Sequence, residues 1–388
     1  MLRPQIPQYR VHLLSAATRE IIQTIDMPYL ETITSLKVMS LEVSEHTHEQ
    51  RDMVVAGTAF MRGEDSPAKG AVTVFDIIDV VPDPDKAESG IKLQVVAREE
   101  TKGAITALTG FQGGLIGTAQ GQKIMIRGLK EDGSCLPVAF LDAQAYTTEL
   151  KTFGHSDLWL AGDACKGVWL GGFTEEPYKL QVFNRTAAKD EMEVLAADFL
   201  PSPDGALYIC VLDRDMNLRV LQYDPENPRA DSLGGVTMRL LHKGRFHIGS
   251  LATGMAVVPS GLLPADAQMT NGHAESEPQR LFQVLATFAD GSMGLITPLD
   301  EATFRRLSAL QSQLASVLEH AGGLNPRAYR AAESEGLGGR GVVDGSLVQR
   351  IGELGTTRRA ELLGRAGMDV WSLGSDLEIV GGGGLSYL

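Results

Sequence analysis

Cysteine, aromatic residues and long apolar runs are all scarce in this 388-residue sequence, and each scarcity excludes a class of protein. Cys135, Cys165 and Cys210 form no C-x-x-C pair and are too few for a disulfide scaffold, so we interpret them as buried thiols of a reducing compartment. The uncharged stretch Ile248 to Pro264 is interrupted by Gly and Pro and is too short to span a bilayer. The amino terminus MLRPQIPQYR lacks the apolar core of a secretory signal. We therefore expect an intracellular, soluble protein with no membrane partner.

Motifs that carry chemistry are also missing. The sequence contains neither a G-x-S-x-G elbow nor an H-E-x-x-H pair. GLGGRG at Gly336–Gly341 carries no Walker lysine and follows no strand, so we interpret it as a linker. His46 and His48 have no cysteine or carboxylate cluster at ligand spacing, which favours a solvated loop over a metal site. The sequence thus predicts no catalytic residue, metal, cofactor or small-molecule substrate, and a propeller enzyme is only a minor alternative.

Positive charge is in deficit. The chain has 35 Lys and Arg against 49 Asp and Glu, a formal net charge of −14. Residues 300–388 hold 9 arginines, no lysine and 11 acidic residues, so residues 1–299 carry −12. Such a surface repels phosphate at long range, which argues against nucleic acid as a partner of this region and suits contacts with other proteins.

Glycine, in contrast, is abundant, with 43 residues or about 11% of the chain against a usual ~7%. This excess indicates many turns, and one pattern, in which a tight turn joins an apolar strand to an alternating strand, occurs five times. The copies are VVAGTAF with KGAVTVFDI, LIGTAQGQKIMIRGL, LWLAGDACKGVWLGG, YICVLDRDMNLRVLQY and VLATFADGSMGLITPL. Their turns fall at Gly70, Gly121, Gly167, Asp215 and Gly291, with spacings of 51, 46, 48 and 76 residues.

Each copy predicts one β-propeller blade. The second strands alternate large apolar and polar residues, as strands with one buried face do. The alternating pairs are Val72/Val74, Ile124/Ile126 and Leu218/Val220. Further strand-like runs between the hairpins are Ile91–Val96, Leu136–Leu141, Tyr178–Phe183 and Val236–Leu241. About four strands per repeat are typical of a blade, which buries both faces only by stacking on its neighbours, whereas a β-sandwich, the alternative, rarely keeps so regular a repeat.

Other segments predict loops and a partial blade. Pro259–Pro278 and Asp224–Gly235 are rich in proline and polar residues, so we expect surface loops, the first of which accounts for the longest spacing. Tyr9–Leu14 and Ile21–Met27 predict the two outer strands of a further blade, whose first strands this sequence does not hold. Because unpaired strand edges invite aggregation, we expect one part of a longer propeller protein, or a ring that closes on segments absent here.

After Thr297 the apolar period becomes helical. Asp300 is the expected N-cap of a first helix, and Asp344 precedes a second that ends at a Gly355 stop. Thr356 or Thr357 is expected to cap a third helix, and a fourth precedes the GGGG tail. The apolar positions are Phe304, Leu307, Leu310, Leu314 and Leu318, then Leu347, Val348, Ile351 and Leu354, then Leu362 and Leu363, then Val370, Leu373, Leu377 and Val380.

The predicted fold is therefore mainly β with a small helical region. Residues 1–299 should form a β-propeller of about five complete four-stranded blades plus a partial one, part of a seven-bladed ring. Residues 300–388 should form a helical C-terminal domain with the Gly-rich linker Glu335–Gly341 and a Gly-rich tail.

Charged and aromatic residues near the turns predict structure rather than chemistry. Asp163 with Lys166, and the block Arg62, Glu64, Asp65 and Lys69, are interpreted as surface charge pairs, with the rim of an interface as the alternative. Trp159 and Trp169 are expected in the core rather than as a ligand platform. Arg305/Arg306 and Arg358/Arg359 are expected on solvated helix faces, with contact to a partner or RNA as the alternative.

Several blocks resemble the CPSF-A region, the C-terminal part of the largest subunit of the cleavage and polyadenylation specificity factor. They span about Tyr9 to Leu363. The blocks are VAGTAFMRGEDSPAKGAVTVFDIIDVVPDPD, VVAREETKGAITALTGFQGGLIGTAQGQKIMIRGL, LAGDACKGVWLGGFTEEPYKLQVF, YICVLDRDMNLRVLQYDPENP, LNPRAYR and VDGSLVQRIGELGTTRRAELLGRAG. The RGED block and the VVPDPD run favour this subunit over relatives in the same family, the damaged-DNA-binding adaptor of cullin ubiquitin ligases and a propeller subunit of splicing factor 3b.

The resemblance implies a nuclear, non-enzymatic scaffold for pre-mRNA cleavage and polyadenylation. In the family, three seven-bladed propellers and a helical domain hold a WD-repeat subunit and a CCCH zinc-finger subunit, which read the AAUAAA signal. This chain would supply most of the third propeller and the helical domain, and its association with RNA would be mostly indirect. The alternatives are a direct nucleic-acid-binding protein and an adaptor of cullin ubiquitin ligases. Because this sequence does not include the first two propellers, we also expect it to be a fragment or the product of a truncated gene model.

Overall fold

The computed structural model describes residues 7–60, 62–64, 66–82, 90–154, 156–187, 190–202, 205–225, 238–260, 281–332 and 339–381. The chain divides into two compact units, Met1–Met192 (unit 1) and Glu193–Leu388 (unit 2). No helix within the described ranges is long and apolar enough to cross a membrane. The division into a propeller domain 1–299 and a helical domain 300–388 remains a prediction.

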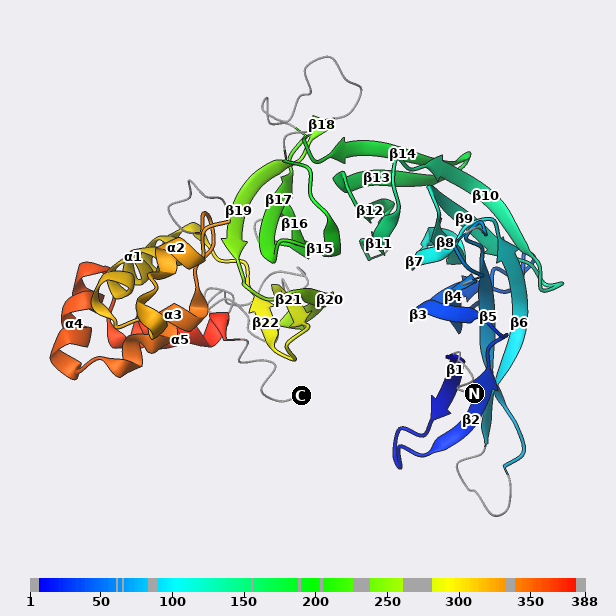
Figure 1. Cartoon of the computed structure of the whole chain (residues 1–388), viewed down its shortest axis with the longest axis horizontal. Helices are drawn as coiled ribbons and strands as arrows, with labels where there is room; N and C mark the ends of the chain where they lie inside the picture. Colours follow the sequence, from blue (N-terminus) through cyan, green and yellow to red (C-terminus); the bar gives the residue numbers. More distant parts are fainter. Residues whose placement is uncertain are drawn as a thin grey trace, which may run out of the picture. The chain divides into compact units, whose positions relative to one another are not determined.

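Unit 1 contributes four strands to each of three antiparallel sheets, paired in sequence order (Figure 1). The first sheet contains β3 (Glu31–Glu42), β4 (Gln50–Phe60), β5 (Gly70–Asp79) and β6 (Ile91–Thr101). The second contains β7 (Ile105–Phe111), β8 (Leu115–Gln120), β9 (Lys123–Leu129) and β10 (Cys135–Asp142), with the 3-10 turn η1 (Gln112–Gly114) after β7. The third contains β11 (Thr147–Thr152), β12 (Leu158–Asp163), β13 (Gly167–Glu175) and β14 (Tyr178–Arg185). The predicted partial blade is the pair β1 (Arg10–Leu14) and β2 (Ile21–Asp26).

Apolar side chains fill the spaces between neighbouring sheets of unit 1. Val72 and Val74 of β5 are fully buried and join a cluster that includes Ile105 and Leu108 of β7. Ile124 and Ile126 of β9 lie in the next cluster, with residues of the third sheet. The alternation predicted from the sequence thus turns one set of residues toward each neighbouring sheet, as stacked propeller blades require.

A β-bulge recurs in the first strand of each sheet of unit 1. The register shifts at Thr34 in β3, Thr106 in β7 and Thr148 in β11. The Thr34 hydroxyl donates to the carbonyl of Ile105 at 2.6 Å, and the Thr106 hydroxyl donates to the carbonyl of Thr147 at 2.5 Å. Because a bulge leaves one residue out of the ladder, it frees these hydroxyls to bond the next sheet.

Unit 2 contains two further sheets. One contains β15 (Val194–Pro201), β16 (Leu207–Asp213), β17 (Asn217–Tyr223) and β19 (Leu241–His247). The other contains β20 (Ala252–Ser260), β21 (Leu281–Phe288) and β22 (Met293–Ile296), three strands within the described residues. Leu218, Cys210 and Val284 lie in the apolar cluster between the two sheets. The fold is therefore mainly β, with five successive blades before a helical region, as predicted.

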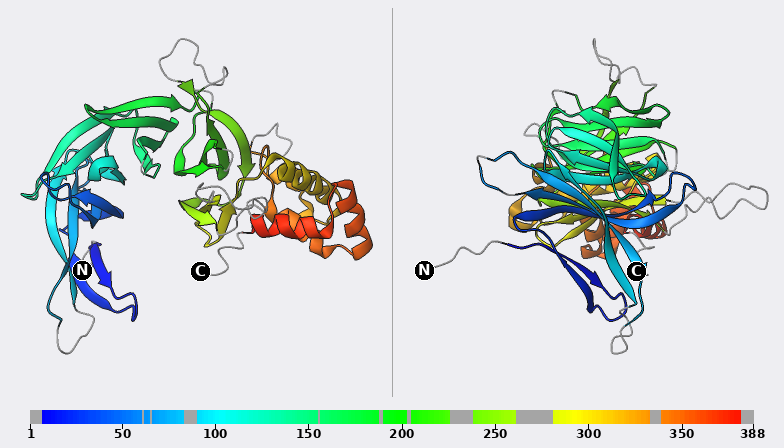
Figure 2. Two further views of the ribbon diagram at one scale, coloured as in Figure 1. Left: turned by 180° about the vertical axis from the view of Figure 1, so that it is seen from behind. Right: turned by 90° about the vertical axis from the view of Figure 1, so that its right-hand side faces the viewer.

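The helical region of unit 2 has its own core. It contains α1 (Glu301–Val317), η4 (Ala321–Gly323), α2 (Pro326–Tyr329), α3 (Gly345–Gln349), η5 (Arg350–Glu353), α4 (Thr356–Arg365) and α5 (Val370–Val380), gold to red in Figure 2. The predicted stripe packs as expected, with Leu307, Leu310 and Leu314 buried against Val348 and Leu362. The Asp300 side chain accepts a hydrogen bond from the Thr303 backbone, which confirms it as the N-cap of α1.

Three local predictions were wrong. Gly355 follows Leu354, the C-cap of η5, as predicted, but it is also the N-cap residue of α4, so Thr356 begins the helix and the predicted threonine cap is wrong. Gly70 is not a turn residue but the buried first residue of β5, where a Cβ would lie 2.2 Å from the carbonyl of Thr58. Of the single strand predicted at Val236–Leu241, residues 238–241 are described, and they contribute to two strands, β18 (Met238–Arg239) and β19, which begins at Leu241.

The predicted loops fall mostly outside the described residues. Of Pro259–Pro278, only Pro259 and Ser260 are described, and both belong to β20. Of Asp224–Gly235, only residues 224 and 225 are described, and the Gly-rich linker is described from residue 339 onward. The Arg340 backbone forms an antiparallel bridge with Arg245 of β19, so the end of the predicted linker pairs with a strand.

Candidate functional site

The turn between β12 and β13 is organised by a buried carboxylate. Asp163, 1% exposed, accepts hydrogen bonds from the backbone N–H groups of Cys165 at 2.7 Å and Lys166 at 2.9 Å. The Lys166 ammonium instead contacts Glu191 at 2.7 Å, and this hydrogen-bonded ion pair raises the pKa of Lys166. The predicted charge pair between Asp163 and Lys166 is therefore wrong: one side chain holds the turn and the other pairs elsewhere.

The Arg62 block also serves local structure. The Arg62 guanidinium lies over the ring of Phe60 at 5.3 Å, and the backbones of Phe60 and Lys69 form an antiparallel bridge. Glu64 is exposed, and Asp65 lies outside the described residues. The block therefore closes the β4–β5 connection and leaves its role at an interface rim as a prediction.

Trp159 and Trp169 lie in the third blade as predicted. Trp159 is fully buried, and its indole N–H donates to the carbonyl of Gly172 at 3.0 Å. Trp169 is half-buried and packs against the same apolar cluster. A tryptophan with a satisfied N–H and no exposed surface belongs to the core.

A buried arginine joins the first two blades. Arg127 of β9 is only 1% exposed, and its guanidinium contacts the Glu99 carboxylate of β6 at 3.1 Å. It also donates to Thr118 at 2.5 Å and Gln120 at 2.6 Å. These partners offset the cost of removing the cation from water, so the group stabilises a blade interface rather than a ligand. The sequence analysis missed it, because no local pattern marks an arginine as buried.

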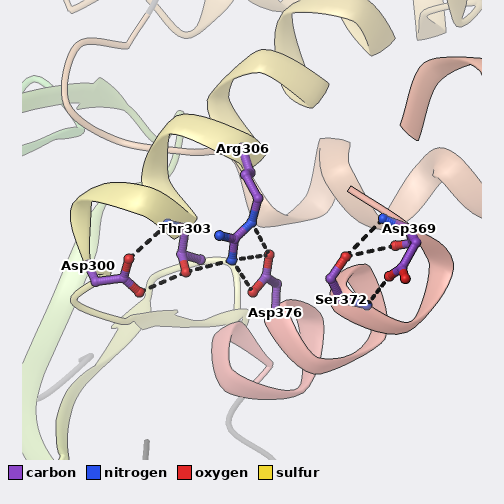
Figure 3. Close-up of polar contacts among 6 residues, drawn as sticks. All are labelled: Asp300, Thr303, Arg306, Asp369, Ser372 and Asp376. Atoms are coloured by element: carbon purple, nitrogen blue, oxygen red, sulfur yellow. Dashed lines mark hydrogen bonds and ion pairs between the residues drawn. The ribbon is translucent and has the colours of Figure 1, made fainter. Parts of the chain in front are cut away.

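Figure 3 shows a network of polar contacts between the start of α1 and α5. The Thr303 hydroxyl donates to Asp300 at 2.7 Å, and the Arg306 guanidinium contacts both Thr303 at 3.0 Å and Asp376 at 3.0 Å. The backbone N–H of Thr303 lowers the pKa of Asp300, and the backbone N–H of Ser372 similarly lowers that of Asp369, the N-cap of α5. The prediction that Arg306 lies on a solvated face is therefore wrong, because its guanidinium joins α1 to α5.

Arg330, in the LNPRAYR block, fixes the helical region to the fourth blade. Its guanidinium donates to the Asp344 carboxylate at 3.0 Å and to the carbonyls of His247 at 3.2 Å and Ile248 at 2.7 Å. It also lies over the ring of Phe246 at 4.9 Å. The backbone carbonyl of Arg330 accepts from the His247 N–H, so one residue makes contacts to β19, α3 and the loop after β19.

Other arginines of the helical region have carboxylates or carbonyls beside them. Arg305 pairs with Glu301. Arg358 pairs with Glu361 at 2.9 Å, and Arg359 donates to the Leu354 carbonyl at 3.1 Å. Arg365 pairs with Glu361, and Arg350 with Glu353. At least six of the nine arginines in residues 300–388 therefore lie in ion pairs within this region.

The three thiols differ in environment. Burial raises the pKa of Cys210 to about 12 and that of Cys135 to about 11. Cys165 is exposed on the β12–β13 turn, so its prediction as a buried thiol was wrong. The His48 imidazole pairs with Glu42 at 2.9 Å on the surface. Among the residues whose positions are described, no cluster of three or more His, Cys, Asp or Glu side chains could hold a metal ion.

Exposed apolar side chains are the feature that sequence reasoning missed altogether. Leu36 and Val38 of β3 are 50% and 68% exposed, and Trp371 at the start of α5 is 86% exposed. Their sequence patterns look like those of buried strands and helices, since a pattern cannot tell whether a neighbouring element is present. Large exposed aromatic and aliphatic residues are the usual material of protein interfaces.

These observations define a class of protein, one with stacked β-propeller blades and a small helical region. The charged groups described above join structural elements of this fold. The chain belongs to the CPSF A subunit region family, whose model matches residues 8–353.

Curated relatives from fungi match almost the whole chain. It is 47% identical over 389 residues to Protein cft1 of Aspergillus fumigatus, covering 99% of this chain and 27% of the relative. It is 46% identical over 384 residues to Protein CFT1 of Coccidioides immitis, covering 98% of this chain and 27% of the relative. It is 33% identical over 368 residues to Protein cft1 of Schizosaccharomyces pombe, covering 94% and 24%. The chain thus spans about a quarter of the length of these relatives.

Proposed function

We propose that this chain is part of a non-enzymatic scaffold subunit of the nuclear machinery that cleaves and polyadenylates pre-mRNA. The observation that carries the proposal is family membership over residues 8–353, together with relatives that match nearly the full chain under one protein name. The family description names a subunit, and a subunit of this kind acts by holding other proteins in place.

The proposed partners are a WD-repeat subunit and a CCCH zinc-finger subunit, which recognise the AAUAAA signal. Stacked blades present rigid edges and loops, and residues 1–299 carry a net charge of −12, which favours protein over phosphate. The arginines of the helical region are the main cationic alternative. At least six of the nine already pair with carboxylates, which supports indirect rather than direct association with RNA.

A pull-down from nuclear extract with the purified chain tests this proposal. The expected result is recovery of the WD-repeat and zinc-finger subunits together, identified by mass spectrometry. The variant Trp371→Ala tests whether the helical region takes part, because this side chain is exposed and its loss should leave the fold unchanged. Recovery of a cullin without either subunit would overturn the proposal in favour of a ubiquitin-ligase adaptor.

A further inference from the structure

The connection between β4 and β5 presents a serine to solvent. Residues 66–69 are all exposed, and Lys69 at their end is fixed by its backbone bridge with Phe60. The turn before them is held weakly, because the backbone N–H of Ser66 lies 3.4 Å from the carbonyl of Gly63, longer than a usual hydrogen bond. The serine is therefore accessible to another protein, and its segment can extend at small cost.

The sequence of this segment, SPAK, has the features that proline-directed protein kinases recognise. Pro67 has no backbone N–H, so it fits a substrate groove that is apolar after the acceptor serine, where any other residue would leave an N–H unpaired. A residue before proline is also biased toward an extended backbone, the conformation in which a kinase binds its substrate. Lys69, three positions after the serine, offers an exposed cation to acidic groups of the kinase.

Two other positions of the chain place a hydroxyl residue before proline, and both lack these features. Ser202 is followed three positions later by Gly205, and Thr297 by Asp300, whose charge is opposite to that of lysine. Both hydroxyl residues are half-buried, and the Thr297 hydroxyl accepts a hydrogen bond from the Gln283 amide at 2.8 Å. Exposure, proline and a cation at the third position therefore occur together in the β4–β5 connection alone among the three.

We propose that Ser66 is a phosphorylation site for a proline-directed protein kinase that prefers a cation three positions after the acceptor. In this reaction the Ser66 hydroxyl oxygen bonds to the γ-phosphorus of ATP, and the bond from that phosphorus to the oxygen bridging the β- and γ-phosphates breaks. ADP leaves, and the hydroxyl proton passes to the catalytic aspartate of the kinase. This chain supplies the acceptor and its flanking residues, and the kinase supplies the catalysis.

The phosphate changes the charge of the connection and leaves the fold in place. Residues 61–69 include two cationic and two acidic side chains, for a formal net charge of zero. A phosphoserine adds about −1.5 to −2 at pH 7. Because Ser66 is exposed, the added group stays in water and should change the stability little. The effect falls on a protein that binds this edge of the blade, since a surface charge acts mainly on the rate of association.

A kinase reaction with the purified full chain tests the proposal. The probe is a cyclin-dependent kinase with its cyclin and magnesium ATP, and mass spectrometry of peptides locates and quantifies the phosphate. Phosphate is expected on Ser66, and Ser66→Ala should remove it. Ser202→Ala removes the serine of another serine-proline pair, so it is the matched control and should leave the rate unchanged.

The role of the cation is tested separately. Lys69→Gln should lower kcat/KM for the chain about fivefold, because one exposed ion pair with the kinase is lost. Lys102→Gln, the same change at an exposed lysine of the β6–β7 connection, should leave kcat/KM unchanged. Circular dichroism of each variant checks that the fold is retained, which is expected because both lysines are exposed.

Three results would overturn the proposal. The first is phosphate on Ser202 or Thr297 in preference to Ser66, and the second is a kcat/KM for Lys69→Gln equal to that of the unmodified chain. The third is phosphorylation of a synthetic peptide of residues 60–73 while the folded chain stays unmodified. This peptide shows that the kinase is active, so the third result would mean that the folded connection is closed to it.

Discussion

The guanidinium of Arg330 donates a hydrogen bond to the backbone carbonyl of Ile248 at 2.7 Å, which joins the end of α2 to the residue that follows β19. The same side chain pairs with Asp344, the N-cap of α3. One residue therefore links a blade to two helical elements, and it lies in one of the blocks that carry the family resemblance.

Loss of this link should loosen the helical region on the fourth blade. Arg330→Met keeps the aliphatic volume but leaves the Asp344 carboxylate and two carbonyls without this donor. We therefore expect the free energy of unfolding to fall by about 2 kcal/mol. Urea unfolding measures the loss, and hydrogen exchange should quicken at the N–H groups of Arg245 and His247. Arg327→Met, at an exposed arginine of the same helix, should change stability by less than about 0.5 kcal/mol. Equal effects of the two substitutions would contradict this role.

Arg127 should be essential for the interface between the first two blades. Arg127→Ala removes the donor to the Thr118 hydroxyl and to the side-chain oxygen of Gln120 in the interior, and we expect the free energy of chemical unfolding to fall by about 3 kcal/mol. Arg51→Ala, which removes an exposed ion pair with Glu49, is the control and should change the stability far less than Arg127→Ala does. A cost for Arg127→Ala no larger than that of the control would show that the buried cation is dispensable.

Asp300 should make the stability of the helical region depend on acid pH. Its folded-state pKa lies below the ordinary value, chiefly because it accepts from the Thr303 backbone, so its contribution is fully present above that ordinary value and is lost as pH falls through the folded pKa. Asp300→Ala should cost about 1 kcal/mol at pH 7, whereas Asp300→Asn should keep most of the cap. Thermal unfolding between pH 7 and pH 3 should give a shallower pH dependence for Asp300→Asn than for the unmodified chain. An unchanged slope would rule out this carboxylate as its source.

The three thiols should react in a fixed order. Cys165 is exposed, whereas burial raises the pKa of Cys135 to about 11 and of Cys210 to about 12. Since the thiolate is the reactive form, maleimide at pH 7.5 should label Cys165 first, and Cys210 only when the chain opens. Peptide mass spectrometry over time gives the order. Labelling of Cys210 at the rate of Cys165 would contradict the burial of β16.

Local signals in the sequence predicted most of the fold. Val72/Val74 and Ile124/Ile126 lie two positions apart because alternate residues of a strand face the same neighbouring sheet, and Asp300 caps α1 through a residue only three positions away. Such features depend on neighbours along the chain. The pairing of Arg306 with Asp376 joins residues seventy positions apart, and the hydrogen-bond partners of Arg127 lie on two other strands, β6 and β8, so no local pattern predicts either.

The candidate surface was harder to predict for a related reason. Leu36 and Val38 precede the buried Met39 on β3 in a pattern typical of a core strand, and only the arrangement of β1–β2 shows that their side is uncovered. The opposite error concerns Cys165, which was predicted to be buried and is exposed. The sequence does not show whether a cysteine in a tight turn faces solvent.

The claim that this chain holds RNA-reading subunits without itself reading RNA is tested most directly by filter binding. The purified chain is titrated against an AAUAAA RNA and a scrambled RNA of equal length, with and without the WD-repeat and zinc-finger subunits. The account predicts no preference for AAUAAA with the chain alone and a preference once both subunits are added. Sub-micromolar binding to AAUAAA over the scrambled RNA by the chain alone would contradict it.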